Sequence, residues 1–194
     1  MEERRLEKRF LDTFDEIVPV MESVRKGFIA QNIALVKDGR AKFQEILRNR
    51  AAFAEKVIQE KKRTDAEIRY MSLIIPFQTV ALAIENVMEK MEIKVEAKIL
   101  FSEKAAKEIN VLIAIVASQL RDIKDYITTR NPNLKAAIKK SMEDLTRLAD
   151  EYTVVHQDRM IQGVCMPKAS YLYIDITDSL KRLSRGLVAF SEKA

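Results

Sequence analysis

Two stretches of the chain, "FQTVALAIENVMEKM" (residues 77–91) and "YIDITDSLKRLSRGL" (residues 173–187), decide the fold class. In both, apolar residues recur at alternating spacings of three and four, which places them on one face of an α-helix. A shift of 96 residues, close to half the chain, superimposes the two apolar rows. The aligned pairs are Phe77 with Tyr173, Val80 with Ile176, Ile84 with Leu180, Val87 with Leu183, and Met91 with Leu187. The pattern predicts two helices that are each buried along one seam. The match also favours a duplicated chain, although any two amphipathic helices match by their period alone.

Helix start and stop signals around these stretches divide the chain into six segments. We expect helices at about residues 3–37, 40–62, 65–92, 95–129, 133–162 and 167–193. Gly39 suits the end of the first helix, Pro19 a kink within it, and Thr64 the N-cap of the third, while Asn131 and Pro132 separate the fourth from the fifth. Short turns between long helices favour antiparallel neighbours. The sequence therefore predicts an all-α fold of six helices, with residues 1–194 as a single domain and two tandem three-helix bundles at 1–93 and 94–194.

Composition indicates a helical protein of cytoplasmic type. Of the 194 residues 47% are hydrophobic, Gly and Pro number four each, and Trp is absent. The charged start "MEERRLEKRF" is unlike a secretory signal, and the single cysteine cannot form an internal disulfide. The longest apolar stretches, "MSLIIPFQTVALAI" and "INVLIAIVASQL", are interrupted or shorter than the roughly 20 residues of a membrane-spanning helix. We therefore expect no segment that crosses a membrane.

The positive net charge of +5 does not by itself indicate nucleic-acid binding. Lysine and arginine alternate with acidic residues in nearly every segment, which is typical of solvated helix faces. No basic run with interleaved aromatic residues is present, so we expect no nucleic-acid partner. Anionic lipid headgroups or an acidic protein are the more plausible partners for this charge.

The stretch "HQDRMIQGVCMPKAS" (residues 156–170) holds the only histidine and the only cysteine of the chain. Gly163 suits a left-handed helix end and Pro167 the first turn of the next helix, so Cys165 falls in the turn between them. A zinc site needs about four ligands, and this stretch supplies one histidine and one cysteine. We therefore expect neither a zinc site nor a catalytic thiol, and we expect His156 to be a partly buried imidazole bonded to a neighbouring helix.

The same stretch carries a resemblance. The pattern H-x-x-R-M-x-x-G-x-C, formed by His156, Arg159, Met160, Gly163 and Cys165 and followed by "YLYIDITDSLKRLSR", resembles the last two helices of the PhoU-like domain at the cytoplasmic end of sodium/phosphate cotransporter-family proteins. "ALAIENVMEKM" and "LFSEKAAKEINVL" are similar to earlier parts of that domain. The resemblance implies two similar three-helix bundles and a membrane phosphate transporter as partner. It also implies carboxylate motifs of the form E/D-x-x-x-D that bind metal ions.

The motif falls on Glu85 and Glu89, and Glu92 extends the row. Spacing of i, i+4 places the first two carboxylates on one helix face, where they could share a Mg, Mn, Ca or Fe ion if another helix, for example through Glu55 or Glu60, supplied further ligands. The corresponding positions of the second half are Lys181 and Arg185, which cannot bind a cation. The alternative interpretation of Glu85, Glu89 and Glu92 is a solvated stripe beside the apolar face.

These features lead us to expect a non-enzymatic protein. The chain has no Gly-rich phosphate loop, no HExxH and no G-x-S-x-G. The resemblance implies a regulatory or accessory domain for phosphate transport, located in the cytoplasm, either free or peripheral to the inner face of the membrane. Two alternatives stay open: a carboxylate-based metal-binding bundle, and a helical scaffold whose apolar groove binds a partner helix or a second copy in a homodimer.

Overall fold

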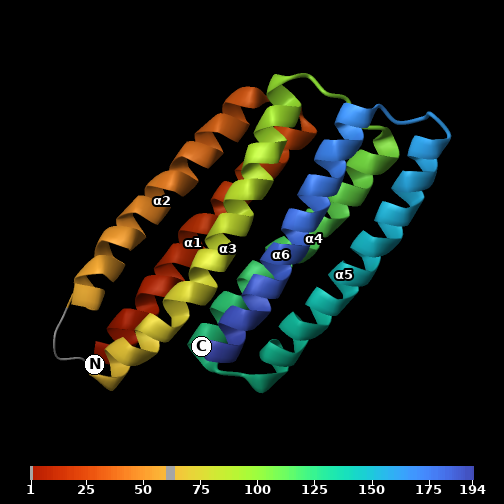
Figure 1. Cartoon of the computed structure of the whole chain (residues 1–194). Coiled ribbons are helices and arrows are strands. Elements are labelled where there is room, and N and C mark those ends of the chain that lie inside the picture. Colours follow the sequence, from red (N-terminus) through yellow and green to blue (C-terminus); the bar gives the residue numbers. More distant parts are fainter. Residues whose placement is uncertain (1, 60–63) are drawn as a thin grey trace.

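The computed structural model describes residues 2–59 and 64–194, and these residues form six α-helices without any strand. The helices are α1 (Glu2–Ile29), α2 (Ile33–Gln59), α3 (Asp65–Glu96), α4 (Glu103–Thr129), α5 (Pro132–Ile161) and α6 (Pro167–Lys193). They run up and down as neighbours in an elongated molecule, with both chain termini at the same end (Figure 1). The predicted all-α fold of six helices is therefore confirmed.

Most helix starts follow the capping residues in the sequence. Thr64 caps α3 in a capping box, in which its hydroxyl accepts from the Glu67 N–H and the Glu67 carboxylate accepts from the Thr64 N–H. Asn131 caps α5, with Pro132 in its first turn. After α5, Gly163 has a φ of +70°, as predicted for a left-handed helix end, and Pro167 opens α6.

The predicted end of the first helix was wrong. Helix α1 stops at Ile29, the backbone turns through Gln31 with a φ of 55°, and Asn32 accepts a hydrogen bond from the Leu35 N–H at the start of α2. Gly39 lies buried inside α2. A Cβ on Gly39 would lie 2.5 Å from Cγ2 of Val24 in α1, so this glycine allows two helices to approach closely and does not end one.

The predicted start of the fourth helix was also too early. Helix α3 continues to Glu96, and Ser102 caps α4 by accepting from the Ala105 N–H at 3.2 Å. The boundary expected between residues 93 and 94 therefore falls inside the last turn of α3. Pro19 and Pro76 both lie within helices, in α1 and α3.

The two aligned stretches lie on α3 and α6, which share the most extensive interhelix contact among the described residues (Figure 1). All ten aligned residues are buried, so the predicted seams are confirmed. Gly186 of α6 faces Val80 of α3, where an added Cβ would lie 3.1 Å from the valine methyl. Helices α1, α2 and α3 contact one another, as do α4, α5 and α6, and α1 also contacts α4.

One hydrophobic core extends through both halves of the chain. Phe10 and Phe14 of α1 each contact Phe77 of α3 and Phe190 of α6, with ring centroids 5.3 to 6.0 Å apart. Aromatic pairs at such distances add to the energy of burial. The halves are thus joined by shared packing as well as by the α3–α4 connection.

By length and composition, α3 is the one helix in the described part of the chain that could cross a membrane, a test that the core helix of a soluble protein also passes.

Candidate functional site

The predicted acidic row on α3 faces an arginine of α2. Arg40 donates from Nε to Glu85 Oε1 at 2.8 Å and from Nη1 to Glu92 Oε2 at 2.9 Å, and Gln44 adds a bond to Glu85 Oε1 at 2.9 Å. Burial opposes the charge of Arg40, but the hydrogen bonds to Glu92 and Glu85 outweigh burial and raise its pKa. These contacts fasten α2 to α3.

Glu85, Glu89 and Glu92 do not converge on a common point for a metal ion. The Arg40 guanidinium lies between Glu85 and Glu92, while Glu89 lies beside Lys90 at 3.8 Å. Nowhere in residues 2–59 and 64–194 do three His, Cys, Asp or Glu side chains form a group that could hold a metal. Glu55 is exposed, and Glu60 lies outside the described residues. The described residues therefore offer no ligand set for the predicted metal site, and the Arg40 guanidinium already binds two of its carboxylates.

The second half repeats this interhelical ion pair with its polarity reversed. Lys181 of α6 occupies the position that corresponds to Glu85, and its Nζ lies 3.1 Å from Asp150 of α5 and 2.9 Å from Asp178. Arg185 is exposed. Glu85 of α3 thus pairs with a basic residue of α2, and the aligned Lys181 of α6 pairs with an acidic residue of α5. Lys181 therefore has acidic partners where Glu85 has a basic one.

His156 belongs to a buried polar cluster, here called the His156 cluster, made with Glu108 of α4, Arg159 of α5 and Tyr173 of α6. Arg159 donates to both Glu108 oxygens at 3.0 and 2.8 Å, and the Tyr173 hydroxyl donates to Glu108 Oε2 at 2.7 Å. The imidazole stacks on the Tyr173 ring with centroids 4.1 Å apart. Its Nδ1 lies 3.1 Å from Arg159 Nη2, which can only donate, so Nδ1 is the acceptor. The cluster joins three helices.

The electrostatics of the His156 cluster favour a neutral imidazole. Burial first, and then the Arg159 charge, lower the pKa of His156, while the Glu108 carboxylate acts in the opposite direction. Burial and the bond to Glu108 raise the pKa of the Tyr173 hydroxyl. His156 is 2% exposed, and its Nε2 has no hydrogen-bond partner among the described residues. The prediction that the imidazole is buried is confirmed. The hydrogen bond expected to a neighbouring helix is instead made to Arg159 on the same helix, and the neighbouring helix α6 contributes the stacked Tyr173 ring.

Gly163 and Cys165 of the sequence motif lie outside this cluster, in the α5–α6 turn, where Cys165 is a half-buried free thiol. Sequence reasoning missed Glu108 and Tyr173 as its members. A signal was present for Glu108, because it shares the apolar face of α4 with Ala105, Ile109 and Leu112, where a carboxylate needs a buried partner. The cluster stabilises the packing of α4, α5 and α6, and within it Arg159 and Glu108 are already paired with each other.

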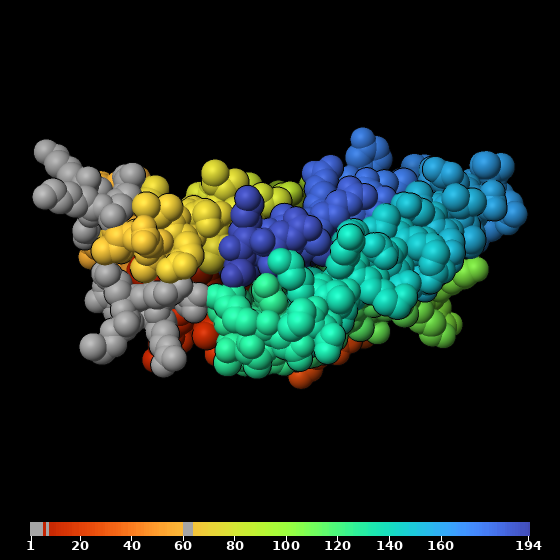
Figure 2. Space-filling view, turned by 90° about the horizontal axis from the view of Figure 1, so that it is seen from below, coloured from red at the N-terminus to blue at the C-terminus, as the bar shows by residue number. Residues whose placement is uncertain are grey.

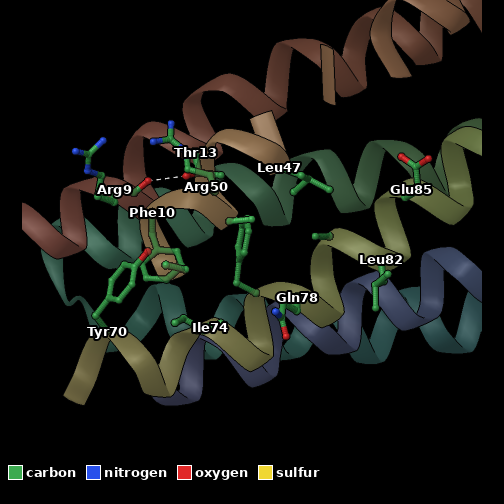
Figure 3. A pocket seen from close by; sticks show the side chains of 14 residues that line it. Arg9, Phe10, Thr13, Leu47, Arg50, Tyr70, Ile74, Gln78, Leu82 and Glu85 are labelled. Carbon is green, nitrogen blue, oxygen red and sulfur yellow. Dashed lines mark hydrogen bonds between the residues drawn. The ribbon is translucent and has the colours of Figure 1, made fainter. Parts of the chain in front are cut away.

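An opening in the surface with a mainly apolar lining lies between α1, α2 and α3 (Figure 3). This groove has a volume of about 380 Å³, within the range of natural ligand pockets. Its apolar lining comes mainly from Phe10, Leu47, Tyr70, Ile74, Phe77 and Leu82. Ala51 and Ala54 of α2 line the groove with small side chains.

Charged groups border the groove. Arg9 and Tyr70 lie at one end and Glu85 at the other (Figure 3). Arg50, on the α2 wall, pairs with Glu16 at 2.5 Å, yet its Nε is buried and lacks a hydrogen-bond partner within the described ranges, as does Glu85 Oε2. An apolar groove was expected from the sequence as one alternative, but its position depends on the gap between α2 and α3, which no single segment encodes.

Comparisons of the chain with family models, with curated proteins and with solved structures found no match.

Proposed function

We propose that this protein is a non-enzymatic accessory protein that binds a helix of a partner in the groove between α1, α2 and α3. The observation that supports the proposal is the groove itself, with apolar walls from three helices and charged residues at its border. Amphipathic helices bind such grooves by inserting side chains spaced three and four residues apart. Leu82, which lines the groove, is 67% exposed and would be covered by such a partner.

The partner that the sequence resemblance implies is a membrane phosphate transporter. We infer from it that the chain is a PhoU-like regulator of phosphate uptake, built as two similar three-helix halves and located at the inner face of the membrane. The burial of equivalent rows on α3 and α6 supports a duplicated architecture of this kind. A ligand that favours one transporter state over another shifts the population of states, so docking of this protein would alter the flux.

The test is co-expression with a sodium/phosphate cotransporter, with co-purification and phosphate uptake as readouts. We expect the wild-type protein to co-purify and to change uptake, and Leu82→Asp to weaken binding by about tenfold or more, as loss of a central apolar contact does. Tyr171→Asp is the matched control, because Tyr171 is 75% exposed on α6, away from the groove. The proposal fails if the wild-type protein neither binds nor changes uptake. Equal losses in both variants would show that binding does not use the groove.

A further inference from the structure

Three turns gather at one end of the molecule, opposite the chain termini (Figure 1). They are the α1–α2, α3–α4 and α5–α6 connections, and we call this region the turn end. Aromatic contacts join the first turn to the second and the second to α6. The ring centroids of Phe28 and Phe101 are 6.1 Å apart, and those of Phe101 and Tyr173 are 6.2 Å apart. Lys94, which is 3% exposed, lies against the rings of both phenylalanines. The turn end is therefore one packed surface.

Large apolar side chains project from the turn end into solvent. Leu100 in the α3–α4 connection is 73% exposed, Ile161 at the end of α5 is 84% exposed, and Val164 and Met166 in the next turn are 64% and 69% exposed. The α5–α6 connection forms the right-hand extremity of the molecule in Figure 2. Connections between helices usually carry polar residues at the surface, and grouped apolar side chains there indicate a contact with an apolar phase or a partner.

Positive charge surrounds these side chains. Lys98, Lys104 and Lys168 are exposed and take part in no ion pair among the described residues. Two nearby carboxylates are already neutralised, because Glu96 pairs with Lys37 and Glu103 with Lys107. Asp158 is an exposed acid at this end. The unpaired charge around the apolar side chains is thus mainly positive.

We propose that the turn end binds the surface of an anionic lipid membrane. Exposed apolar side chains at the end of a molecule can enter the boundary between headgroups and acyl chains, while flanking lysines interact with anionic headgroups. A lipid surface can take up side chains that are 64% to 84% exposed, whereas a partner helix binds in a groove. The interaction deepens the membrane location given under the proposed function, but it requires no transporter, so vesicles alone can test it. The bundle would then stand on the membrane with its turn end, and the groove between α1, α2 and α3 would stay free to bind a partner.

The absence of tryptophan makes this proposal directly measurable, because a single introduced tryptophan is the only indole in the chain. In Leu100→Trp the indole replaces an apolar side chain of the turn end, and in Ile75→Trp it replaces one on the flank of α3. Both positions are 73% exposed, so the two variants are matched. The full-length proteins are mixed with vesicles of phosphatidylcholine and phosphatidylglycerol, or of phosphatidylcholine alone. We expect the emission of Leu100→Trp to shift to shorter wavelength with the anionic vesicles only, and that of Ile75→Trp to stay unchanged.

A charge variant tests the lysines in the Leu100→Trp background. Lys98→Gln combined with Lys168→Gln should lower the vesicle partition coefficient roughly tenfold or more, since each lysine near an anionic surface contributes about 1 kcal/mol. Lys139→Gln combined with Lys193→Gln removes the same charge from exposed sites elsewhere and should have a small effect. The proposal is overturned if Leu100→Trp shows no shift with anionic vesicles, if neutral vesicles shift it equally, or if Ile75→Trp shifts as much.

Discussion

At the scale of single residues, His156 shows how burial determines what a histidine does. Alone in the sequence, it was compatible with a ligand, a base or a core residue. The structure places its ring against Tyr173 and its Nδ1 beside Arg159, in a cluster whose charges are paired by Glu108. Because it cannot gain a proton without adding an unpaired charge beside Arg159, the neutral ring is the stable form.

The pH dependence of stability should therefore carry a contribution from His156. Its folded-state pKa is lowered below the ordinary value of 6.5. As the pH falls below 6.5, the unfolded chain binds a proton that the folded chain does not, so the free energy of unfolding decreases. The slope for one proton is at most about 1.4 kcal/mol per pH unit. Urea denaturation between neutral pH and the onset of carboxylate protonation measures this effect.

The control for this prediction is His156→Gln, which removes the titrating group and keeps an acceptor for Arg159. We expect the variant to be less stable at neutral pH, because the stack on Tyr173 is lost, but to show a flatter pH dependence. If both proteins lose stability with the same slope below pH 6.5, His156 is not the titrating group.

At the scale of helices, the sequence predicted those boundaries that depend on local chemistry. Thr64, Asn131, Gly163 and Pro167 mark helix ends because their own hydrogen bonds or backbone angles favour those positions. Gly39 was misplaced because a glycine has two uses: it can end a helix, or it can let another helix approach. The second use depends on Val24, fifteen positions earlier on a neighbouring helix, and no local pattern encodes that contact.

Replacing Gly39 by alanine should lower the free energy of unfolding by up to about 2 kcal/mol. The added methyl would overlap with Val24 and force α1 from α2, which in packed interiors typically costs about 1–3 kcal/mol. Alanine gains about 1 kcal/mol over glycine in helix propensity, which offsets part of the loss. Chemical denaturation of the purified variant measures the change.

A double-mutant cycle with Val24→Ala assigns this cost to the contact. Val24→Ala alone leaves a cavity, but together with Gly39→Ala the new methyl partly fills it. We expect the double variant to be more stable than the sum of the single changes by at least about 0.5 kcal/mol. Strictly additive effects would mean that the overlap is relieved elsewhere.

At the scale of the whole molecule, the sequence predicted features that lie within one helix and missed those that form where several segments meet. The buried seams of α3 and α6 were predictable, because each row lies within one helix. The groove needs α1, α2 and α3 in their final positions, and the turn end needs three connections that are at least sixty residues apart in sequence. The His156 cluster likewise takes its members from three helices, so the sequence supplied His156 and Arg159 but not their partners.

The shared core predicts that the two halves of the chain stabilise each other. A chain cut between Lys98 and Ile99 yields one fragment ending after α3 and one containing α4, α5 and α6, each with a row of apolar residues uncovered where α3 and α6 had met. Each buried leucine or isoleucine contributes about 1.5–3 kcal/mol, so we expect each fragment alone to melt well below the intact chain. Mixing should restore a one-to-one complex with a higher melting temperature, measured by light scattering and circular dichroism.

Ile84→Asp, in the buried row, should prevent the complex, whereas Leu82→Asp, two residues away and exposed, should not. Fragments that melt separately at the temperature of the intact chain would instead identify two independent bundles, and the aromatic contacts between α1, α3 and α6 would then add little to stability.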